Sequence, residues 1–393
     1  MTQSPAAADV EAYLDWAAST PMRASAVNAM VEATAHFGNP TGAHRHAREA
    51  RRVVDDAREL IGDALGAHPS EVIFTGGGTE ADNLAIFGSC SSEQLPACSA
   101  VEHHAVLHPV EHLGGPIVGV DALGQLDLDH LGAALGDAHA KGRQVGVVSV
   151  MLANNETGVV QPLEPIAEVM HEHAPDALLH TDAIQAFPWI DVAAAASKAD
   201  LISITGHKFG GPKGVGVLIV RKSAKISAHI LGGGQEFELR SGTHNVAGIA
   251  GLGAAVAEME RERADTVARV GVLRDRLADG LIAAVPDTIE TGVPTPGDRS
   301  AKVAGACHLC FGGIESETLL FLLERAGISA SAASSCSAGA QDPSHVLAAM
   351  GYSRELAGGS LRLSLGYGST DADVEHALAV IPPAVEQLRS RAA

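Results

Sequence analysis

The chain lacks the features of a membrane, secreted or disulfide-stabilised protein. No segment reaches the roughly 18 uninterrupted apolar residues that a membrane span requires. Residues 1–10 have neither the basic start nor the apolar run of a signal peptide, and the five cysteines among 393 residues form no disulfide framework. We therefore expect a cytoplasmic protein whose thiols are reduced.

Basic residues are scarce as well. The chain has 27 Lys and Arg against 47 Asp and Glu, a formal net charge of −20. This balance argues against a broad surface for nucleic acid or anionic membrane, so neither partner is predicted.

The length and the pattern of apolar residues predict two domains of α/β type. Single cores stop growing near ~250 to 300 residues, and this chain is longer. Short β-rich runs alternate with helical segments, and the predicted strands are residues 71–74, 145–150, 177–180, 201–204, 215–220, 303–311 and 360–365. This alternation indicates a mostly parallel sheet covered on both faces. We predict a large domain over residues 15–264 and a smaller α/β domain from residues 1–14 and 265–393, with turns at the Pro- and Gly-rich stretch 285–297.

The most informative stretch, residues 203–214, sets a lysine between an apolar strand and a run of glycines. Lys208 would be held there so that its amine can lose a proton and attack a carbonyl, as a Schiff base requires. Thr205 and His207 supply a hydroxyl and an imidazole for a phosphate, and the glycines let backbone approach closely. The stretch indicates pyridoxal phosphate chemistry.

Two other predicted strand ends carry residues that suit the same cofactor. Residues 74–83 indicate a strand, a glycine turn and a helix start, where backbone amides and the Thr79 hydroxyl could hold a phosphate; alone, this is more often only a tight turn. Asp182 could pair with a protonated pyridine nitrogen and Gln185 could donate to the ring hydroxyl, although Asp182 could equally cap a helix. With Lys208 at the end of the next strand, the cofactor interpretation is favoured.

These motifs and others resemble, in order along nearly the whole chain, those of cysteine desulfurases of the nitrogen-fixation and iron-sulfur-cluster type, within the class V aminotransferase group. The matching runs are residues 13–15, 39–41, 74–84, 102–106, 154–162, the Asp182 and Lys208 segments, 232–236, 239–243 and 360–366. The resemblance implies the aspartate-aminotransferase-like fold, which is fold type I of pyridoxal-phosphate enzymes, normally as a homodimer. It also implies pyridoxal 5'-phosphate as cofactor and L-cysteine as substrate.

The resemblance assigns roles residue by residue. It makes Lys208 the Schiff-base lysine, Asp182 the partner of the pyridine nitrogen and His103 a catalytic residue that stacks on the ring. The cofactor-binding residues it implies are Gly78, Thr79, His103, Asn155, Asp182, Gln185, Thr205, His207, Lys208 and Thr243. Thr243 would reach the phosphate of the neighbouring subunit, and Asn155 and Arg362 would bind the substrate, Arg362 at its carboxylate.

Cys336 lies in a run of small residues at about 329–342 that predicts an exposed, mobile loop. A loop cysteine is by itself more often incidental, because reactivity needs a suitable microenvironment. The resemblance makes Cys336 the nucleophile that takes sulfur from L-cysteine as a persulfide, leaves L-alanine and delivers the sulfur to an acceptor in iron-sulfur cluster assembly or thiolation. Ala333 and Ser335 depart from the family pattern, where glycine and alanine are commoner.

Other interpretations remain open from the sequence. The chain could be a selenocysteine lyase, an ordinary class V aminotransferase with no need of Cys336, or, from another class, a non-enzymatic sulfur-relay partner with a vestigial site. Cys307 and Cys310 could suggest redox or zinc chemistry, but they lie on a predicted strand with no second ligand pair, so packing is favoured and no metal site is expected.

Overall fold

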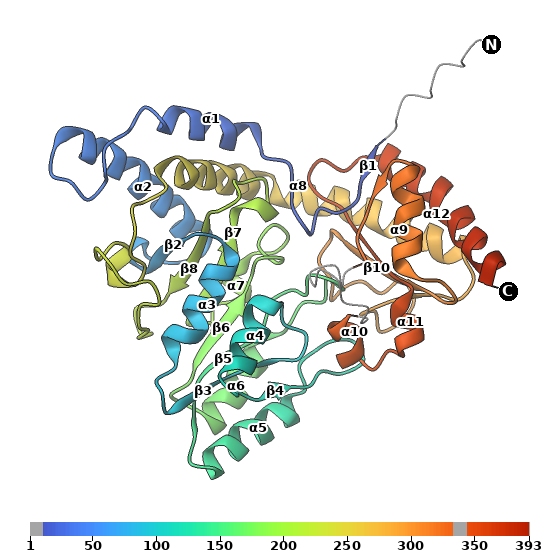
Figure 1. The fold of residues 1–393 in the computed structure, drawn as a ribbon, viewed down its shortest axis with the longest axis horizontal. Helices are drawn as coiled ribbons and strands as arrows, with labels where there is room; N and C mark the ends of the chain where they lie inside the picture. The colour runs from blue at the N-terminus through green and yellow to red at the C-terminus, as the bar shows by residue number, and fades with distance from the viewer. Residues whose placement is uncertain (1–10, 333–343, 393) are drawn as a thin grey trace. The chain divides into compact units, whose positions relative to one another are not determined.

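The computed structural model describes residues 11–332 and 344–392, so Cys336 and most of its predicted loop lie outside the described residues (Figure 1). The chain divides into two compact units. The larger comprises residues 19–155 and 159–264, and the smaller comprises residues 1–18, 156–158 and 265–393. The predicted domain boundaries, between residues 14 and 15 and between residues 264 and 265, remain a proposal.

A seven-stranded sheet forms the centre of the larger unit, with strand order β2-β8-β7-β6-β5-β3-β4. Its strands are β2 (Val72–Thr75), β3 (Gln94–Ser99), β4 (Ile117–Val118), β5 (Gln144–Ser149), β6 (Leu178–Asp182), β7 (Leu201–Thr205) and β8 (Gly216–Val220). Strand β8 runs antiparallel to both of its neighbours, and the other adjacent pairs are parallel. The predicted α/β class with a mostly parallel sheet is confirmed.

Strands β7 and β8 are buried along their whole length, as expected for a sheet with both faces covered. Strand β3 is absent from the sequence prediction, because Pro96 interrupts its pattern and proline is unfavourable within a ladder. The structure accommodates Pro96 through a register shift against β5 between Leu95 and Pro96.

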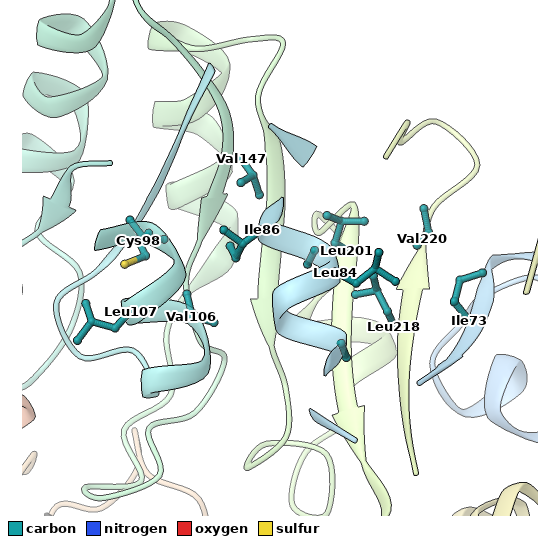
Figure 2. Packing of buried hydrophobic residues seen from close by; sticks show 13 residues of the cluster. Ile73, Leu84, Ile86, Cys98, Val106, Leu107, Val147, Leu201, Leu218 and Val220 are labelled. Atoms are coloured by element: carbon teal, nitrogen blue, oxygen red, sulfur yellow. The ribbon is translucent and has the colours of Figure 1, made fainter. Parts of the chain in front are cut away.

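The helices of the larger unit are α1 (Ala24–Ala33), α2 (Arg45–Ala64), α3 (Gly78–Ser89), α4 (His104–His112), α5 (Leu128–Ala140), α6 (Leu163–His173), α7 (Val192–Ala195) and the first part of α8 (Val246–Ala284), whose residues from 265 belong to the smaller unit. The unit also contains 3-10 turns η1 (Pro69–Glu71), η2 (Gly206–Lys208) and η3 (Glu236–Glu238). Helix α3 packs on β5, β7 and β8 and beside α4. Figure 2 shows Leu84 and Ile86 of α3 beside Val147, Leu201 and Leu218 of the sheet.

Truncation of Leu84 should test how much this contact stabilises the larger unit. Leu84 is 2% exposed in the core cluster, so Leu84→Ala should lower the free energy of unfolding by about 2–5 kcal/mol through lost burial and a residual cavity. Val272 on α8 is 69% exposed, and Val272→Ala should change it by less than about 0.5 kcal/mol. Denaturant titration of the purified variants measures both; equal effects would contradict the assigned packing.

The smaller unit contains an antiparallel sheet of order β12-β10-β9 and a parallel pair, β1 with β11. Its strands are β1 (Ala12–Tyr13), β9 (Thr288–Glu290), β10 (Ala306–Phe311), β11 (Ile328–Ser329) and β12 (Ser360–Ser364). Its remaining helices are α9 (Ser316–Arg325), α10 (His345–Ala349), α11 (Arg354–Gly358) and α12 (Asp371–Ala392). Within the described ranges, no helix combines the length and the apolar character needed to cross a membrane.

The stretch 285–297, predicted as turns only, contains strand β9. Its residues pair with β10, from Leu309 opposite Glu290 to Phe311 opposite Thr288. A strand of three residues among prolines and glycines shows no recognisable β pattern in the sequence. Its pairing partner, β10, lies about twenty residues further along the chain.

Candidate active site

Two adjacent parallel strands bring Asp182 and Lys208 to one edge of the larger unit's sheet. Asp182 is the last residue of β6, and Lys208 ends the 3-10 turn that follows β7. Asp182 is 4% exposed, and burial raises its pKa to about 6, while the Ile184 amide and the positive charge of Lys208 oppose the rise. The buried carboxylate and the lysine amine therefore interact electrostatically.

Asp182 does not cap a helix, which was the alternative left open. Its Oδ1 accepts a hydrogen bond from the Ile184 amide at 2.8 Å within the turn that follows β6. The next helix, α7, begins at Val192 and is capped by Asp191. The carboxylate of Asp182 therefore keeps further acceptor capacity at the sheet edge.

The glycine turn before α3 makes close backbone packing possible. Gly77, the N-cap residue of α3, has φ +141°, a conformation that residues with a Cβ rarely adopt. A Cβ on Gly216 would meet the Gly77 carbonyl carbon at 2.6 Å, and a Cβ on Gly78 would collide with the Ile184 side chain. The turn exposes amides of the first turn of α3, including those of Gly78 and Thr79, to an anion.

Thr205 ends β7, and His207 lies in the 3-10 turn that follows it. A Cβ on Gly78 would lie 3.5 Å from Thr205 Cβ, so Thr205 is next to the glycine turn. Thr205 is buried at the end of β7, and its hydroxyl donates to the Val215 carbonyl at 3.1 Å. His207 Nδ1 lies 3.4 Å from the Ser19 hydroxyl. Burial and then the charges of Lys208 and Lys213 lower the pKa of His207 to about 4, so its imidazole is neutral near pH 7.

His103 forms the N-cap of α4. Its Nδ1 accepts a hydrogen bond from the Ala105 amide at 3.1 Å. In the neutral ring the proton is then on Nε2, which makes Nε2 a donor. Local capping thus fixes the tautomer of the predicted catalytic histidine.

The other predicted cofactor residues of the larger unit occupy loops. Asn155 and Gln185 are half-buried, Gln185 in the turns that follow Asp182. Thr243 is exposed, shortly before α8. The structure of one chain thus leaves Thr243 on the surface.

Sequence reasoning missed an ion network that fixes the loop preceding Thr243. Glu236 accepts from Arg58 in two hydrogen bonds of 2.7 and 3.0 Å, from the Phe74 amide at 2.7 Å, and pairs with His244 Nε2 at 2.7 Å. Burial raises the pKa of Glu236, but the bonds from His244 and Arg58 outweigh burial and lower it. The local signal was Glu236, the second residue after the glycines 232–234; its partner Arg58 lies 178 positions earlier, in α2.

A second pair joins the same loop to α3. Arg240 Nε lies 2.7 Å from Glu80 Oε1, and Glu80 Oε2 accepts from the Gly76 amide at 2.9 Å. The segment that carries Thr243 is therefore attached to the glycine turn of the candidate phosphate site.

In the smaller unit, Arg362 is held on β12 by charge. It is 5% exposed, and its Nη2 lies 2.8 Å from Asp15 Oδ1. Burial raises the pKa of nearby Glu156, and the Ser344 hydroxyl, His345 and Arg362 oppose this rise in decreasing order. The Arg362 guanidinium is pre-positioned by its ion pair with Asp15.

Cys307 and Cys310 lie buried on β10, and burial raises the pKa of each to about 12. A thiol with such a pKa is unreactive near neutral pH. The described part of the chain contains no group of three or more His, Cys, Asp or Glu side chains placed to hold a metal ion.

The residues of the larger unit fit pyridoxal phosphate by their chemistry. A carboxylate buried at Asp182 favours a cationic partner such as a pyridinium, since burial alone disfavours its charge. The glycine turn, where a Cβ would fill the space, offers backbone amides to a phosphate. Lys208, which lies close enough to Asp182 to affect its pKa, supplies the amine for a Schiff base with the aldehyde.

This fold and this donor set define an α/β protein with a lysine site suited to an aldehyde cofactor. Residues 12–377 match the family model described as aminotransferase class-V, and the chain belongs to that family. It is 42% identical to the "IscS-like cysteine desulfurase" of Mycobacterium tuberculosis, over 97% of this chain and 98% of that protein.

Solved structures agree with the family assignment. A structure titled "NIFS-LIKE PROTEIN" superposes with a TM-score of 0.85 at 30% identity, covering 96% of this chain and 100% of that chain. A structure titled "SspA in complex with cysteine" superposes with a TM-score of 0.71 at 29% identity, covering 91% and 100%. The predicted resemblance and fold class are confirmed.

Proposed function

We propose that this protein is a cysteine desulfurase that binds pyridoxal 5'-phosphate, converts L-cysteine to L-alanine and passes the sulfur to an acceptor. The observation that carries the proposal is the proximity of buried Asp182 and Lys208 at neighbouring strand ends, in a chain 42% identical to a desulfurase relative. The cysteine named in one structural relative's title supports the substrate.

The larger unit would hold the cofactor. Asp182 would bind the pyridine nitrogen, and the amides of Gly78 and Thr79 would bind the phosphate, together with His207. The Thr205 hydroxyl donates its hydrogen bond to the Val215 carbonyl. Thr205 would therefore support phosphate binding through its backbone or through its position at the strand end. When bound, the cofactor withdraws electrons from the substrate Cα.

Proton transfer falls to Lys208 and His103. The Lys208 amine would take the proton from the substrate Cα. His103 carries a hydrogen on Nε2, because Nδ1 is occupied by the Ala105 amide, and Nε2 is the atom that donates to the substrate or its sulfur. Asn155 and Gln185 would hold the ring hydroxyl of the cofactor, and Asn155 would also contact the substrate.

Arg362 binds the substrate carboxylate. The ion pair with Asp15 at 2.8 Å fixes one side of the guanidinium, whose five donors allow a carboxylate to be bound through two parallel hydrogen bonds. Cys336, outside the described residues, is the nucleophile, and the resulting persulfide is delivered to an acceptor protein. A homodimer in which Thr243 reaches the neighbouring phosphate, and a cytoplasmic location, complete the proposal.

Arg362→Ala should raise KM for L-cysteine by roughly 10- to 100-fold, since it removes charge-assisted hydrogen bonds to the carboxylate. The exposed Arg325 on α9 provides the matched control, and Arg325→Ala should leave KM within about twofold. Initial rates across cysteine concentrations measure both. An unchanged KM in Arg362→Ala would assign the carboxylate to another residue.

The activity itself is tested with the purified, cofactor-loaded protein, L-cysteine and a thiol reductant. Equal amounts of alanine and sulfide are expected. Parallel rates on selenocysteine and cysteine sulfinate separate the desulfurase from a lyase of another substrate. Conversion of the cofactor to its amine form without alanine release would instead identify an aminotransferase.

A further inference from the structure

A buried chain of hydrogen bonds crosses the central strands beneath α3. His180 on β6 lies with Nδ1 2.8 Å from the Ser149 hydroxyl of β5 and with Nε2 3.0 Å from the Ser203 hydroxyl of β7. All three side chains are fully buried. Each imidazole nitrogen therefore has a neutral hydroxyl partner, which suits an uncharged ring.

Asp82 of α3 faces this chain and is fully buried. In the part of the chain that the structure describes, neither of its carboxyl oxygens has a hydrogen-bond partner of normal geometry. Its ion-pair contact there is His180 Nε2, at 3.7 Å. Burial lowers the pKa of His180 to about 3, so this imidazole brings no positive charge near neutral pH.

The other titratable groups that act on Asp82 are acids. Burial raises its pKa most, the charge of Asp182 adds to the rise, the nearby Ser203 hydroxyl opposes it, and Glu102 adds a smaller rise. Glu102 is itself fully buried, and it accepts a hydrogen bond from the Met151 amide at 2.6 Å. An ionised Asp82 would thus be a buried charge among acids, which is strongly unfavourable.

The same helix and strand serve the candidate cofactor site. Asp82 is one helical turn after Gly78, and His180 precedes Asp182 by two residues on β6, so both strand side chains lie on one face of the sheet. Helix α3 packs on that part of the sheet. Asp82 and His180 therefore lie near Asp182, the carboxylate assigned to the pyridine nitrogen, and the charge of Asp182 acts on Asp82.

We propose that Asp82 is held as a neutral carboxylic acid in the folded protein and, with His180, acts as a positioning residue that keeps Asp182 the ionised partner of the cofactor. The inference deepens the proposed function and rests on it for the role of Asp182. Two neighbouring carboxyls compete for one negative charge, and the group that stays protonated leaves the charge to the other. Lys208 acts on Asp182 and favours its ionised form.

Infrared spectroscopy of the cofactor-free protein tests the protonation state directly. At pH 8, wild type should show carbonyl-stretch absorption of a protonated carboxylic acid that shifts in heavy water. Asp82→Asn should remove one such component, while Asp182→Asn should retain it. An Asp82→Asn spectrum identical to wild type in this region would overturn the proposal.

Cofactor titration tests the positioning role. Asparagine has the shape and neutrality of a protonated aspartic acid, so Asp82→Asn should keep the Kd for pyridoxal phosphate within about threefold, whereas Asp182→Asn should raise it about tenfold or more. A tenfold loss in Asp82→Asn would mean that Asp82 carries a charge the cofactor uses. If wild type fails to bind pyridoxal phosphate, the proposed function falls, while the infrared result still decides the state of Asp82.

The pH dependence of unfolding gives a further readout. An acid whose pKa is raised by folding binds its proton in the native state and loses it on unfolding, so stability falls as pH rises between the unfolded and folded pKa values. Asp82→Asn should flatten this dependence in the cofactor-free protein by about one proton, or about tenfold in the unfolding constant per pH unit. The pH midpoint of the bound cofactor's visible absorbance should be unchanged in Asp82→Asn, which keeps this position neutral; a shifted midpoint would contradict the positioning role.

Discussion

Lys208→Ala is expected to reduce alanine formation from L-cysteine by about 10³-fold or more, because it removes both the Schiff-base amine and the base at the substrate Cα. Lys208 ends the turn after β7 and acts electrostatically on Asp182, which places its amine at the candidate cofactor site. Turnover is measured by alanine production with the cofactor supplied in excess.

Lys213 gives the matched control for this experiment. It lies in the same loop and is exposed, and Lys213→Ala should keep turnover within about twofold of wild type. Borohydride reduction of the loaded wild type, followed by mass spectrometry, should find the cofactor on the peptide that contains Lys208. Cofactor trapped on another lysine, or near-normal turnover of Lys208→Ala, would refute the assignment.

Cys336→Ala should lower sulfide release by about 10²-fold or more while the visible absorbance of the bound cofactor persists. In the proposed transfer, the Cys336 thiolate attacks the substrate sulfur: an S–S bond forms and the Cβ–S bond of cysteine breaks. The electron pair stays with the carbon fragment, which takes up a proton and leaves as alanine. Without Cys336 the substrate can bind but has no acceptor for its sulfur.

Mass spectrometry after incubation with L-cysteine provides the direct measurement. Wild type should gain one sulfur atom on the peptide that contains Cys336. Cys90→Ala is the control, since burial raises the pKa of Cys90 to about 11 and makes it a poor nucleophile. Sulfur found on Cys90, or normal sulfide release by Cys336→Ala, would exclude Cys336 as the carrier.

Much of the larger unit's framework could be predicted because its signals are local. Continuous apolar runs specify the buried strands β5 to β8, and polar residues directly after them mark the ends. Adjacent parallel strands bring their carboxyl ends to one edge of the sheet, which is why Asp182 and Lys208 could be paired from the sequence alone.

What escaped prediction depends on partners distant in sequence. Strand β3 is recognisable only beside β5, since Pro96 disrupts its pattern, and β9 is recognisable only beside β10. The network around Glu236 joins residues that are 178 positions apart in the case of Arg58. A single sequence carries no periodic signal for such pairs.

The sequence by itself determined the α/β class, the order of the motifs and the identity of the residues offered to a cofactor. The spacing of apolar residues, the turn glycines and the chemistry of single side chains can all be read from neighbouring positions in the sequence, and they suffice for those conclusions. Only the tertiary structure decided that Asp82 is shut away from water beside a neutral His180 and that the Thr205 hydroxyl is already bonded to Val215. Solvent exclusion and hydrogen-bond pairing arise when α3 packs on sheet strands that come from distant parts of the chain, and they fix which acids keep their charge.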